Sequence, residues 1–374
     1  MRRRDRQSEG LGAAVSHRWC RLFVGTLAIG WLAMPAGAAD RLVTTTETLL
    51  GELVGMTPAA IEFRRQGASG RPETIPVDSV VRLSLETEPS RVTEARQLLE
   101  QAAFQAATEV ISEVTPVELE VASAAVRGEY AFVKAAAAGR QAAASGQNLA
   151  AGLAAVTDFL DRFSRSIHRY PMLELAGDLE LASGRPAAAI ALYEELATGP
   201  PSLAIRAARL QGEALLAAGE RAEAARVFAS VADQPARDAA SRRERAAARL
   251  GEAACLIALD RPAKAVSLVQ AVLAAADPPA DSDAASQRQL ARAYALLGRA
   301  CLTDGRDQDA LIAYLTVDLV HSGDPESHAE ALFRLHDLWN RGRYPQRAGE
   351  ARRRLEQTYP ASAWAGRLQE QAVP

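Results

Sequence analysis

The sequence predicts a mainly α-helical protein in which stacked helical hairpins follow a small β unit. Three observations lead to this fold class. Ala accounts for 80 of the 374 residues, while aromatic residues make up only 5%, and Ala combines the highest helix propensity with little bulk. A pattern of small and large residues recurs from residue 173 onward. Between residues 41 and 88 the helical spacing gives way to a period of two, which is typical of strands.

The first 38 residues predict a secretory signal peptide. They combine an Arg-rich start, an apolar run over Leu22–Met34 and small residues around Ala36–Ala39, which are the three parts of such a signal. We therefore expect an exported protein that works outside the cytoplasm, in a bacterial periplasm or the medium. No later apolar stretch is long enough for a membrane span, so none is expected after cleavage. Retention of the apolar run as an anchor is the alternative.

The net charge limits the expected partners, and the cysteines limit the expected disulfide bonds. The chain has a formal net charge of −3, and residues 1–38 contribute six Arg against two acidic residues, which leaves −7 for the rest. Binding to phosphate backbones needs a basic face, so nucleic acid is not an expected partner. Cys255 and Cys301 fall at core-like positions of predicted helices. We expect two buried free thiols, with a disulfide as the alternative that an oxidising compartment permits.

Residues 40–88 are expected to form a small β domain. Strands are predicted at 42–46, 50–54, 61–63, 74–77 and 81–85, with turn residues between them. About forty-five residues can close as a small barrel. The segment order, with Gly51-Glu52-Leu53 in a bent second strand and Ile75–Val80 before the last, resembles the SH3-like or Sm-like barrels. This resemblance implies a packing or docking module.

The rest of the chain, residues 92–374, repeats a pattern of small and large residues. Aligned copies share a small residue in a first helix, another small residue twelve positions later and a large residue four positions further on. The clear copies are Gly177, Ala189 and Tyr193; Gly212, Ala224 and Phe228; Ala253, Ala265 and Val269; and Gly298, Ala310 and Tyr314. Weaker copies are expected around Gly146, Ala151 and Phe159, around Phe104 and Ala107, and over Ala329–Pro360.

Each position of the pattern has an expected mechanical role. The small residue of the first helix should face the small residue of the second, so that the two backbones cross closely. Gly184, Gly219 and Gly305 should end the first helix in the left-handed conformation, and the large residues should fill the space toward the next pair. The pattern resembles the tetratricopeptide repeat (TPR). That resemblance implies a right-handed solenoid of about 34-residue units, here five or six hairpins with a capping helix over Ala361–Gln371.

The resemblance also implies which side chains would meet a partner. In tetratricopeptide repeats the first helices line a concave groove, and contacts fall at fixed offsets from the small residue. Carried over, the candidate partner-binding residues are Glu174, Asp178, Arg206, Arg209, Glu213, Arg292 and Arg299. Mixed charges beside apolar positions suit an extended or helical peptide. The alternative is that these side chains form ordinary solvated helix faces.

The sequence contains no catalytic or metal-binding motif, so neither enzyme activity nor a cofactor is expected. His328 and His336 could share a helix face, but about 12 Å separates them along a helix, which is too far for one metal ion. The expected function is an exported scaffold that binds proteins or peptides, with cell-envelope assembly as one setting. The alternative is binding or processing of cell-wall glycan by a helical solenoid or toroid. Few aromatic platforms are available for that, because Trp339 and Trp364 are the only tryptophans after the leader.

Overall fold

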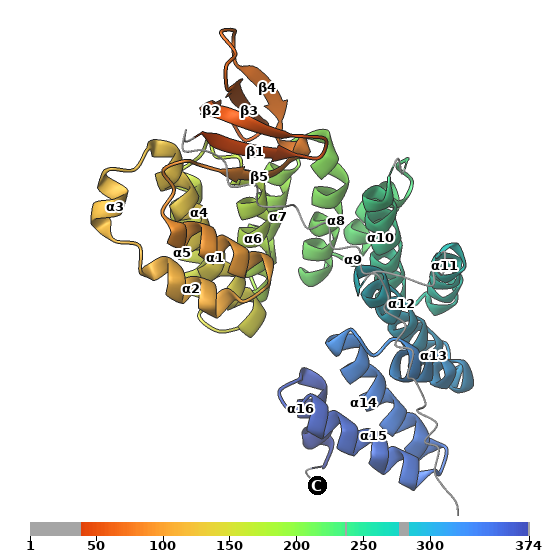
Figure 1. Ribbon diagram of the computed structural model, residues 1–374. Helices are drawn as coiled ribbons and strands as arrows, with labels where there is room; N and C mark the ends of the chain where they lie inside the picture. The colour runs from red at the N-terminus through yellow and green to blue at the C-terminus, as the bar shows by residue number, and fades with distance from the viewer. Residues whose placement is uncertain (1–38, 236–237, 277–283, 373–374) are drawn as a thin grey trace, which may run out of the picture. The chain divides into compact units, whose positions relative to one another are not determined.

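The structure is a computed structural model that describes residues 39–235, 238–276 and 284–372. Within these ranges the chain forms five strands, sixteen α-helices and one short 3-10 helix (Figure 1). The predicted signal peptide, residues 1–38, lies outside the described residues. None of the helices in these ranges has both the length and the apolarity that crossing a membrane requires.

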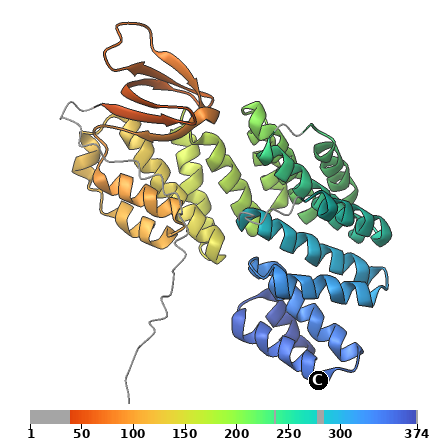
Figure 2. The same cartoon turned by 45° about the vertical axis from the view of Figure 1, so that its right-hand side comes forward.

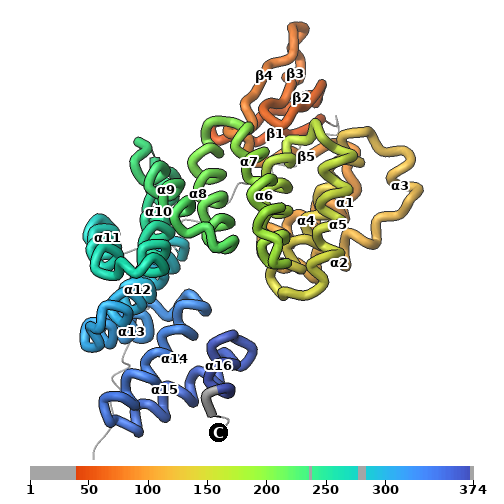
Figure 3. The backbone as a smooth tube through the Cα atoms, turned by 180° about the vertical axis from the view of Figure 1, so that it is seen from behind, coloured from red at the N-terminus to blue at the C-terminus, as the bar shows by residue number. Residues whose placement is uncertain are grey.

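The helices form seven consecutive hairpins within the described ranges, which are α1–α2, α4–α5, α6–α7, α8–α9, α10–α11, α12–α13 and α14–α15 (Figures 1 and 3). Their bounds are α1 (Ser90–Glu100), α2 (Phe104–Ser112), α4 (Ala124–Ser145), α5 (Leu149–Arg162), α6 (Arg169–Ala182), α7 (Pro186–Leu196), α8 (Pro201–Ala217), α9 (Arg221–Ala232), α10 (Ala239–Ala258), α11 (Pro262–Ala275), α12 (Ala284–Thr303), α13 (Asp307–Val320), α14 (Pro325–Arg341) and α15 (Pro345–Thr358). A short helix, α3 (Pro116–Glu120), joins the first two pairs. The array is mainly helical as predicted, and it contains seven hairpins where five or six were expected.

The β unit is a five-stranded antiparallel sheet. Its strands are β1 (Asp40–Thr44), β2 (Thr48–Met56), β3 (Ala60–Arg65), β4 (Glu73–Pro76) and β5 (Val80–Ser84). Their order is β4-β3-β2-β1-β5, so the last strand returns to pair with the first. A 3-10 turn over Val77–Ser79 connects β4 to β5. All five predicted strands are therefore present, but they form a sheet with β4 and β5 at its edges, and no pairing between these two edge strands closes the expected barrel within the described residues.

Strand β2 is bent where the sequence predicts it. Its register against β3 shifts between Leu53 and Gly55. A Cβ atom on Gly51 would lie only 1.9 Å from the carbonyl oxygen of Arg64. Only glycine allows the two backbones to approach this closely.

The sheet shares its hydrophobic core with the helices. Leu42 and Phe63 are fully buried in a cluster that also contains Val126 of α4 and Ile167, which lies just before α6. Figure 2 shows the sheet across one end of these helices. The β unit is thus packed on the array by shared apolar contacts.

The close contact inside each hairpin differs from the expected one. A Cβ on Gly177 would lie 2.3 Å from the ring of Tyr193, and a Cβ on Gly298 would lie 2.7 Å from the ring of Tyr314. The nearest atoms therefore belong to the aromatic residue sixteen positions later, and not to Ala189 or Ala310. The prediction that glycine faces alanine is wrong in this detail. The ring is the larger group and occupies the space that the missing side chain leaves open.

The repeat aromatic Phe228 contacts two neighbouring hairpins. Phe228 lies against Gly212 of its own hairpin and against Gly251 of the next first helix, where added Cβ atoms would come within 2.8 and 2.5 Å of its ring. This confirms that the large residue also fills space toward the neighbouring pair. Four alanines of the second helices, Ala189, Ala224, Ala265 and Ala310, are fully buried in the same stack.

The turns inside the hairpins have the predicted left-handed residue. Gly184, Gly219 and Gly305 have φ between 72° and 83°, and the same turn position holds Asp260 at 57° and Arg343 at 63°. In the first of these turns the amide of Gly184 donates to Leu181 O, and the next amide donates to Glu180 O. Equivalent bonds recur in the other four turns. This is the hydrogen-bond pattern by which a left-handed residue ends a helix.

Two weak copies of the repeat are displaced by one residue from the prediction. Ala151 is exposed, and the small buried residue of α5 is Gly152, whose added Cβ would lie 2.7 Å from that of Ala142. In the last hairpin Gly342 keeps a helical φ of −75°, and its neighbour Arg343 takes the left-handed position. In both places glycine alone is a weaker signal than the burial pattern around it.

The array ends in the predicted capping helix. Helix α16 (Ala363–Ala372) packs on α14 and α15, with Trp364 and Leu368 buried beside Leu332 and Leu355.

The two cysteines of the described chain, Cys255 and Cys301, are both buried and free of any disulfide, as expected. Burial raises the pKa of the Cys255 thiol to about 11.

Candidate functional site

Most first helices of successive hairpins lie side by side. Contacts join α4 to α6, α8 to α10, α10 to α12 and α12 to α14. The predicted partner-binding residues sit on three of these helices, and together they define what we call the first-helix surface: Glu174 and Asp178 on α6, Arg206, Arg209 and Glu213 on α8, and Arg292 and Arg299 on α12.

Most charges of the first-helix surface pair with the next first helix. Arg206 of α8 donates through Nε to Glu174 Oε1 of α6 at 3.0 Å. Arg209 bonds to Glu213 in its own helix and to Glu244 of α10, each at 2.5 Å. The Arg206–Glu174 and Arg209–Glu244 pairs join residues that are 32 and 35 positions apart in the sequence. This separation is about the length of one repeat. The ion pairs therefore connect consecutive hairpins.

The pairs between α12 and α14 are of two kinds. Arg299 contacts Glu330 in a bidentate pair at 3.1 and 2.7 Å, and the Glu330 side chain is only 4% exposed. Arg292 lies 3.7 Å from Asp324, and its own side chain is 68% exposed. A buried carboxylate needs its cation, so Arg299 has a structural role here, whereas Arg292 is largely available to solvent.

Asp178 has an altered acidity. Its Oδ1 accepts a hydrogen bond of 2.8 Å from the Tyr193 hydroxyl. Desolvation raises the pKa of Asp178 to about 6, and the nearby carboxylates of Glu174 and Glu213 act in the same direction. This side chain therefore changes charge in a range where an ordinary aspartate is fully ionised.

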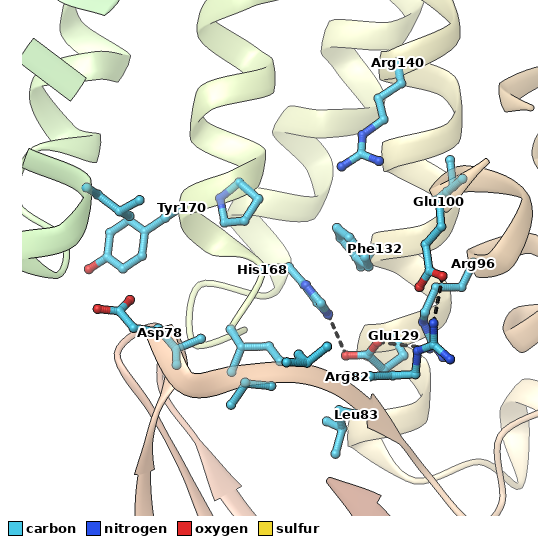
Figure 4. Close-up of a pocket in the computed structure, with 17 residues that line it drawn as sticks. Asp78, Arg82, Leu83, Arg96, Glu100, Glu129, Phe132, Arg140, His168 and Tyr170 are labelled. Carbon is cyan, nitrogen blue, oxygen red and sulfur yellow. Dashed lines mark hydrogen bonds and ion pairs between the residues drawn. The ribbon is translucent and has the colours of Figure 1, made fainter. Parts of the chain in front are cut away.

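A second candidate site lies where the sheet meets the helices. An open cavity of about 380 Å³ is lined by β5, the turn before it, and helices α1, α4, α6 and α8. Figure 4 shows Arg140, His168 and Tyr170 around its centre and Arg82, Arg96 and Glu129 on one side. The sequence carries no signal for this site, because its lining residues are spread from position 77 to position 203.

A buried ionic network forms one side of this cavity. Glu129 is 2% exposed, accepts a bond of 3.1 Å from Arg96 and lies 2.9 Å from His168 Nε2. Burial alone would raise the pKa of Glu129, but His168 and Arg96 outweigh it and hold that pKa below its ordinary value. Arg96 also pairs with Glu88. The imidazole of His168 stacks on Phe132, with ring centroids 3.6 Å apart. The network joins α1 and α4 to the segment before α6.

The cavity has a second, unpaired side. Arg140 and Tyr170 line it, and neither side chain has a hydrogen bond or ion pair to any described residue. Arg82, by contrast, is held by Glu100 at 2.8 Å. In Figure 4 the Arg140 side chain extends from α4 toward the middle of the cavity. The Tyr170 hydroxyl points the other way, toward Asp78, so the uncommitted donor in the cavity is the partly buried Arg140 guanidinium.

No protein-family model and no curated protein matches the chain, but solved structures do. A tetratricopeptide repeat protein from Parabacteroides merdae is similar over 72% of this chain and 91% of its own, with a TM-score of 0.52 and 13% identity. The chain has the tetratricopeptide-repeat fold. A Rap protein complexed with Competence and Sporulation Factor is similar over 74% of this chain and 76% of its own, with a TM-score of 0.50 and 14% identity.

The TPR array contains one more polar cluster that the sequence did not predict. His328 of α14 lies 2.8 Å from Asp318 of α13 through Nε2 and 2.8 Å from the Tyr359 hydroxyl through Nδ1. Arg354 of α15 forms a bidentate pair with the same aspartate. Burial would raise the pKa of Asp318, but His328 and Arg354 reverse the effect and lower it. The cluster ties three helices of the last two hairpins together.

The histidines of this region do not share a metal site in the described chain. His336 is engaged with the carbonyl oxygen of Ala348 at 2.9 Å, away from the partners of His328. The described residues contain no group of three or more His, Cys, Asp or Glu side chains that could hold a metal ion.

Proposed function

We propose that this chain is a scaffold that binds a partner protein or peptide on the first-helix surface of its TPR array. The observation that carries the proposal is the alignment of charged and apolar side chains along successive first helices. Beside the ion pairs runs a row of half-buried apolar residues, one in each clear hairpin: Leu181, Leu216, Ile257 and Leu302. Such a row gives affinity for a peptide, while the neighbouring charges fix its register.

A relative with the same fold supports this use of the array. The Rap protein to which the chain is similar is complexed with Competence and Sporulation Factor. A TPR array can present a continuous surface to a partner because each repeat contacts only its neighbours. We assign no catalytic residue and no cofactor.

We also propose that the protein works outside the cytoplasm, in the cell envelope. This rests on the signal-peptide pattern of residues 1–38 and on the acidic charge of the remaining chain. Cell fractionation followed by N-terminal sequencing tests it. A chain that begins near residue 39 in the envelope fraction supports export, and an intact leader in the cytoplasm contradicts it.

The binding proposal is tested first by site-specific photo-crosslinking. The crosslinking amino acid replaces Leu216 on the first-helix surface, and in a control it replaces Ile312, which is 63% exposed on the second helix α13. A crosslinked protein or peptide at Leu216 that is absent at Ile312 identifies the partner. Equal crosslinking at the two positions would place recognition elsewhere.

The affinity of charge-reversal variants for the purified partner is then measured. A variant on the first-helix surface is compared with one on a second helix, which separates a local contact from the effect of net charge. Arg206 pairs with Glu174 on the first-helix surface, and Arg226 pairs with Glu223 on the second helix α9. We expect Arg206→Glu to weaken binding about tenfold through like-charge contact with a partner carboxylate, and Arg226→Glu to leave it unchanged. Sedimentation with purified wall polymer addresses the glycan alternative. Polymer binding without a protein partner would favour that alternative, although Trp364 is only 8% exposed and Arg347 covers the ring of Trp339 at 4.7 Å.

A further inference from the structure

We propose that the cavity between the sheet and the helices binds a small amphipathic anion, with Arg140 as the group that receives its carboxylate. The ligand class is a carboxylate carried on a compact apolar or aromatic body. The proposal does not depend on the proposed function.

One cation of the lining is left without a protein partner in the described chain. Each described acidic side chain of the cavity has a partner: Glu100 is paired with Arg82, Glu129 with Arg96 and His168, and Asp78 accepts a bond of 2.8 Å from Ser202. Among the described charged residues of the lining, the one without such a partner is Arg140. An incoming anion therefore meets an uncommitted guanidinium at Arg140.

The free guanidinium fits an oxygen acceptor. Arg140 has no hydrogen-bond or ion-pair partner among the described residues and lines the cavity, whereas the Tyr170 hydroxyl points toward Asp78 on the other side (Figure 4). A guanidinium can bind a carboxylate through two parallel bonds, and such charge-assisted bonds are about twice as strong as neutral ones. A carboxylate held by Arg140 would give this guanidinium the partner that the described residues do not supply.

The remaining wall suits an apolar body. Leu83 of β5, Leu99 of α1, Ile167 and Leu203 of α8 line the cavity together with the Phe132 ring. Its volume of about 380 Å³ falls in the range of small-molecule sites, roughly 300–1,000 Å³. Apolar walls with few polar groups are the usual composition of such sites.

The test compares a charged probe with its neutral counterpart. Calorimetric titration of the purified protein uses phenylbutyrate and phenylbutanol, which share one aromatic body and differ in the carboxylate. We expect phenylbutyrate to bind with a dissociation constant on the order of 1 mM or below, and phenylbutanol to bind at least about tenfold more weakly. Equal affinity for the two probes, or no binding of phenylbutyrate, would overturn the proposal.

Variants place the binding within the cavity. Arg140→Gln should lower phenylbutyrate affinity about tenfold and leave phenylbutanol unaffected. The matched control is Lys134→Gln, which removes an exposed cation from the same helix α4 and should change neither affinity. Leu203→Phe should fill part of the cavity and weaken both probes. Circular dichroism and thermal unfolding of each variant verify the fold. An Arg140→Gln protein that is folded and binds phenylbutyrate normally would refute the assignment.

Discussion

The substitution Gly177→Ala tests how the hairpins of the array are packed. The new Cβ would lie 2.3 Å from Cε1 and 2.6 Å from Cζ of Tyr193. The ring must therefore move by about 1 Å to reach an ordinary contact, which begins near 3.4 Å. It is poorly placed to do so, because Tyr193 is fully buried and its hydroxyl is bonded to Asp178 at 2.8 Å. Overpacking of this kind costs about 1–3 kcal/mol.

A matched control isolates this cost. Replacing a helical glycine by alanine also gains about 0.5–1 kcal/mol of helix stability wherever it occurs. Gly349, inside α15, has no atom within 4 Å of an added Cβ, so Gly349→Ala should show that gain alone. Urea unfolding followed by circular dichroism should then find Gly349→Ala more stable than the parent protein, and Gly177→Ala about 1–3 kcal/mol less stable than Gly349→Ala.

A second variant shows whether the ring is responsible. In the Gly177→Ala protein, the further change Tyr193→Leu removes the colliding ring atoms. We expect the two changes together to cost less than the sum of their separate effects, since they share one contact. If Gly177→Ala proves as stable as Gly349→Ala, or if the two costs simply add, the glycine–aromatic contact does not hold the hairpin as described.

Three further predictions follow from single residues. Arg343 has a left-handed φ of 63°, so Arg343→Gly should stabilise the protein by about 1 kcal/mol in thermal unfolding. Gly305→Arg at the equivalent turn should destabilise it, and a change of the same sign in both variants would exclude backbone strain as the cause. The folded pKa of Asp178 is raised to about 6, so the stability it contributes is present below its unfolded pKa of about 3.9 and is lost as the pH rises through 6. Asp178→Asn should therefore flatten the fall in melting temperature between these pH values, and a carboxyl NMR titration with an ordinary midpoint would contradict this. Cys255 is buried with its pKa raised to about 11, so iodoacetamide should label it only after unfolding, and rapid labelling of the native protein would show that the helix opens there.

The periodic part of the fold could be predicted because its rules are local. The left-handed turn at Gly184 and the buried Ala189 five residues later follow from steric requirements that lie within one hairpin. Asp260 and Arg343 can also occupy the left-handed turn position, at some cost in backbone strain. Their residue types alone do not predict that conformation. The strands were predictable for a similar reason, since alternation is a property of a few neighbouring residues.

The sites could be predicted only where the repeat itself supplied an alignment. The positions of Glu174 and Arg206 follow from their offsets to the repeat glycines, but their pairing depends on how two hairpins stack. The cavity could not be predicted at all. It brings Arg82 of the sheet, Arg140 of α4 and Leu203 of α8 to one place, and no sequence pattern connects a meander of strands with the end of a helical array.

The strength of the ion pairs decides which part of the first-helix surface is open to a partner. Arg206 is 46% exposed in its pair with Glu174, and pairs this accessible contribute only about 0–1 kcal/mol. A peptide carboxylate could therefore replace Glu174 at little cost. Arg299 is different, because releasing it would leave the buried Glu330 without a cation, at a cost of about 3–5 kcal/mol. Recognition by exchange of ion pairs is thus expected at α6 and α8. On α12 a partner would have to bind around the Arg299–Glu330 pair, using the exposed Arg292 instead.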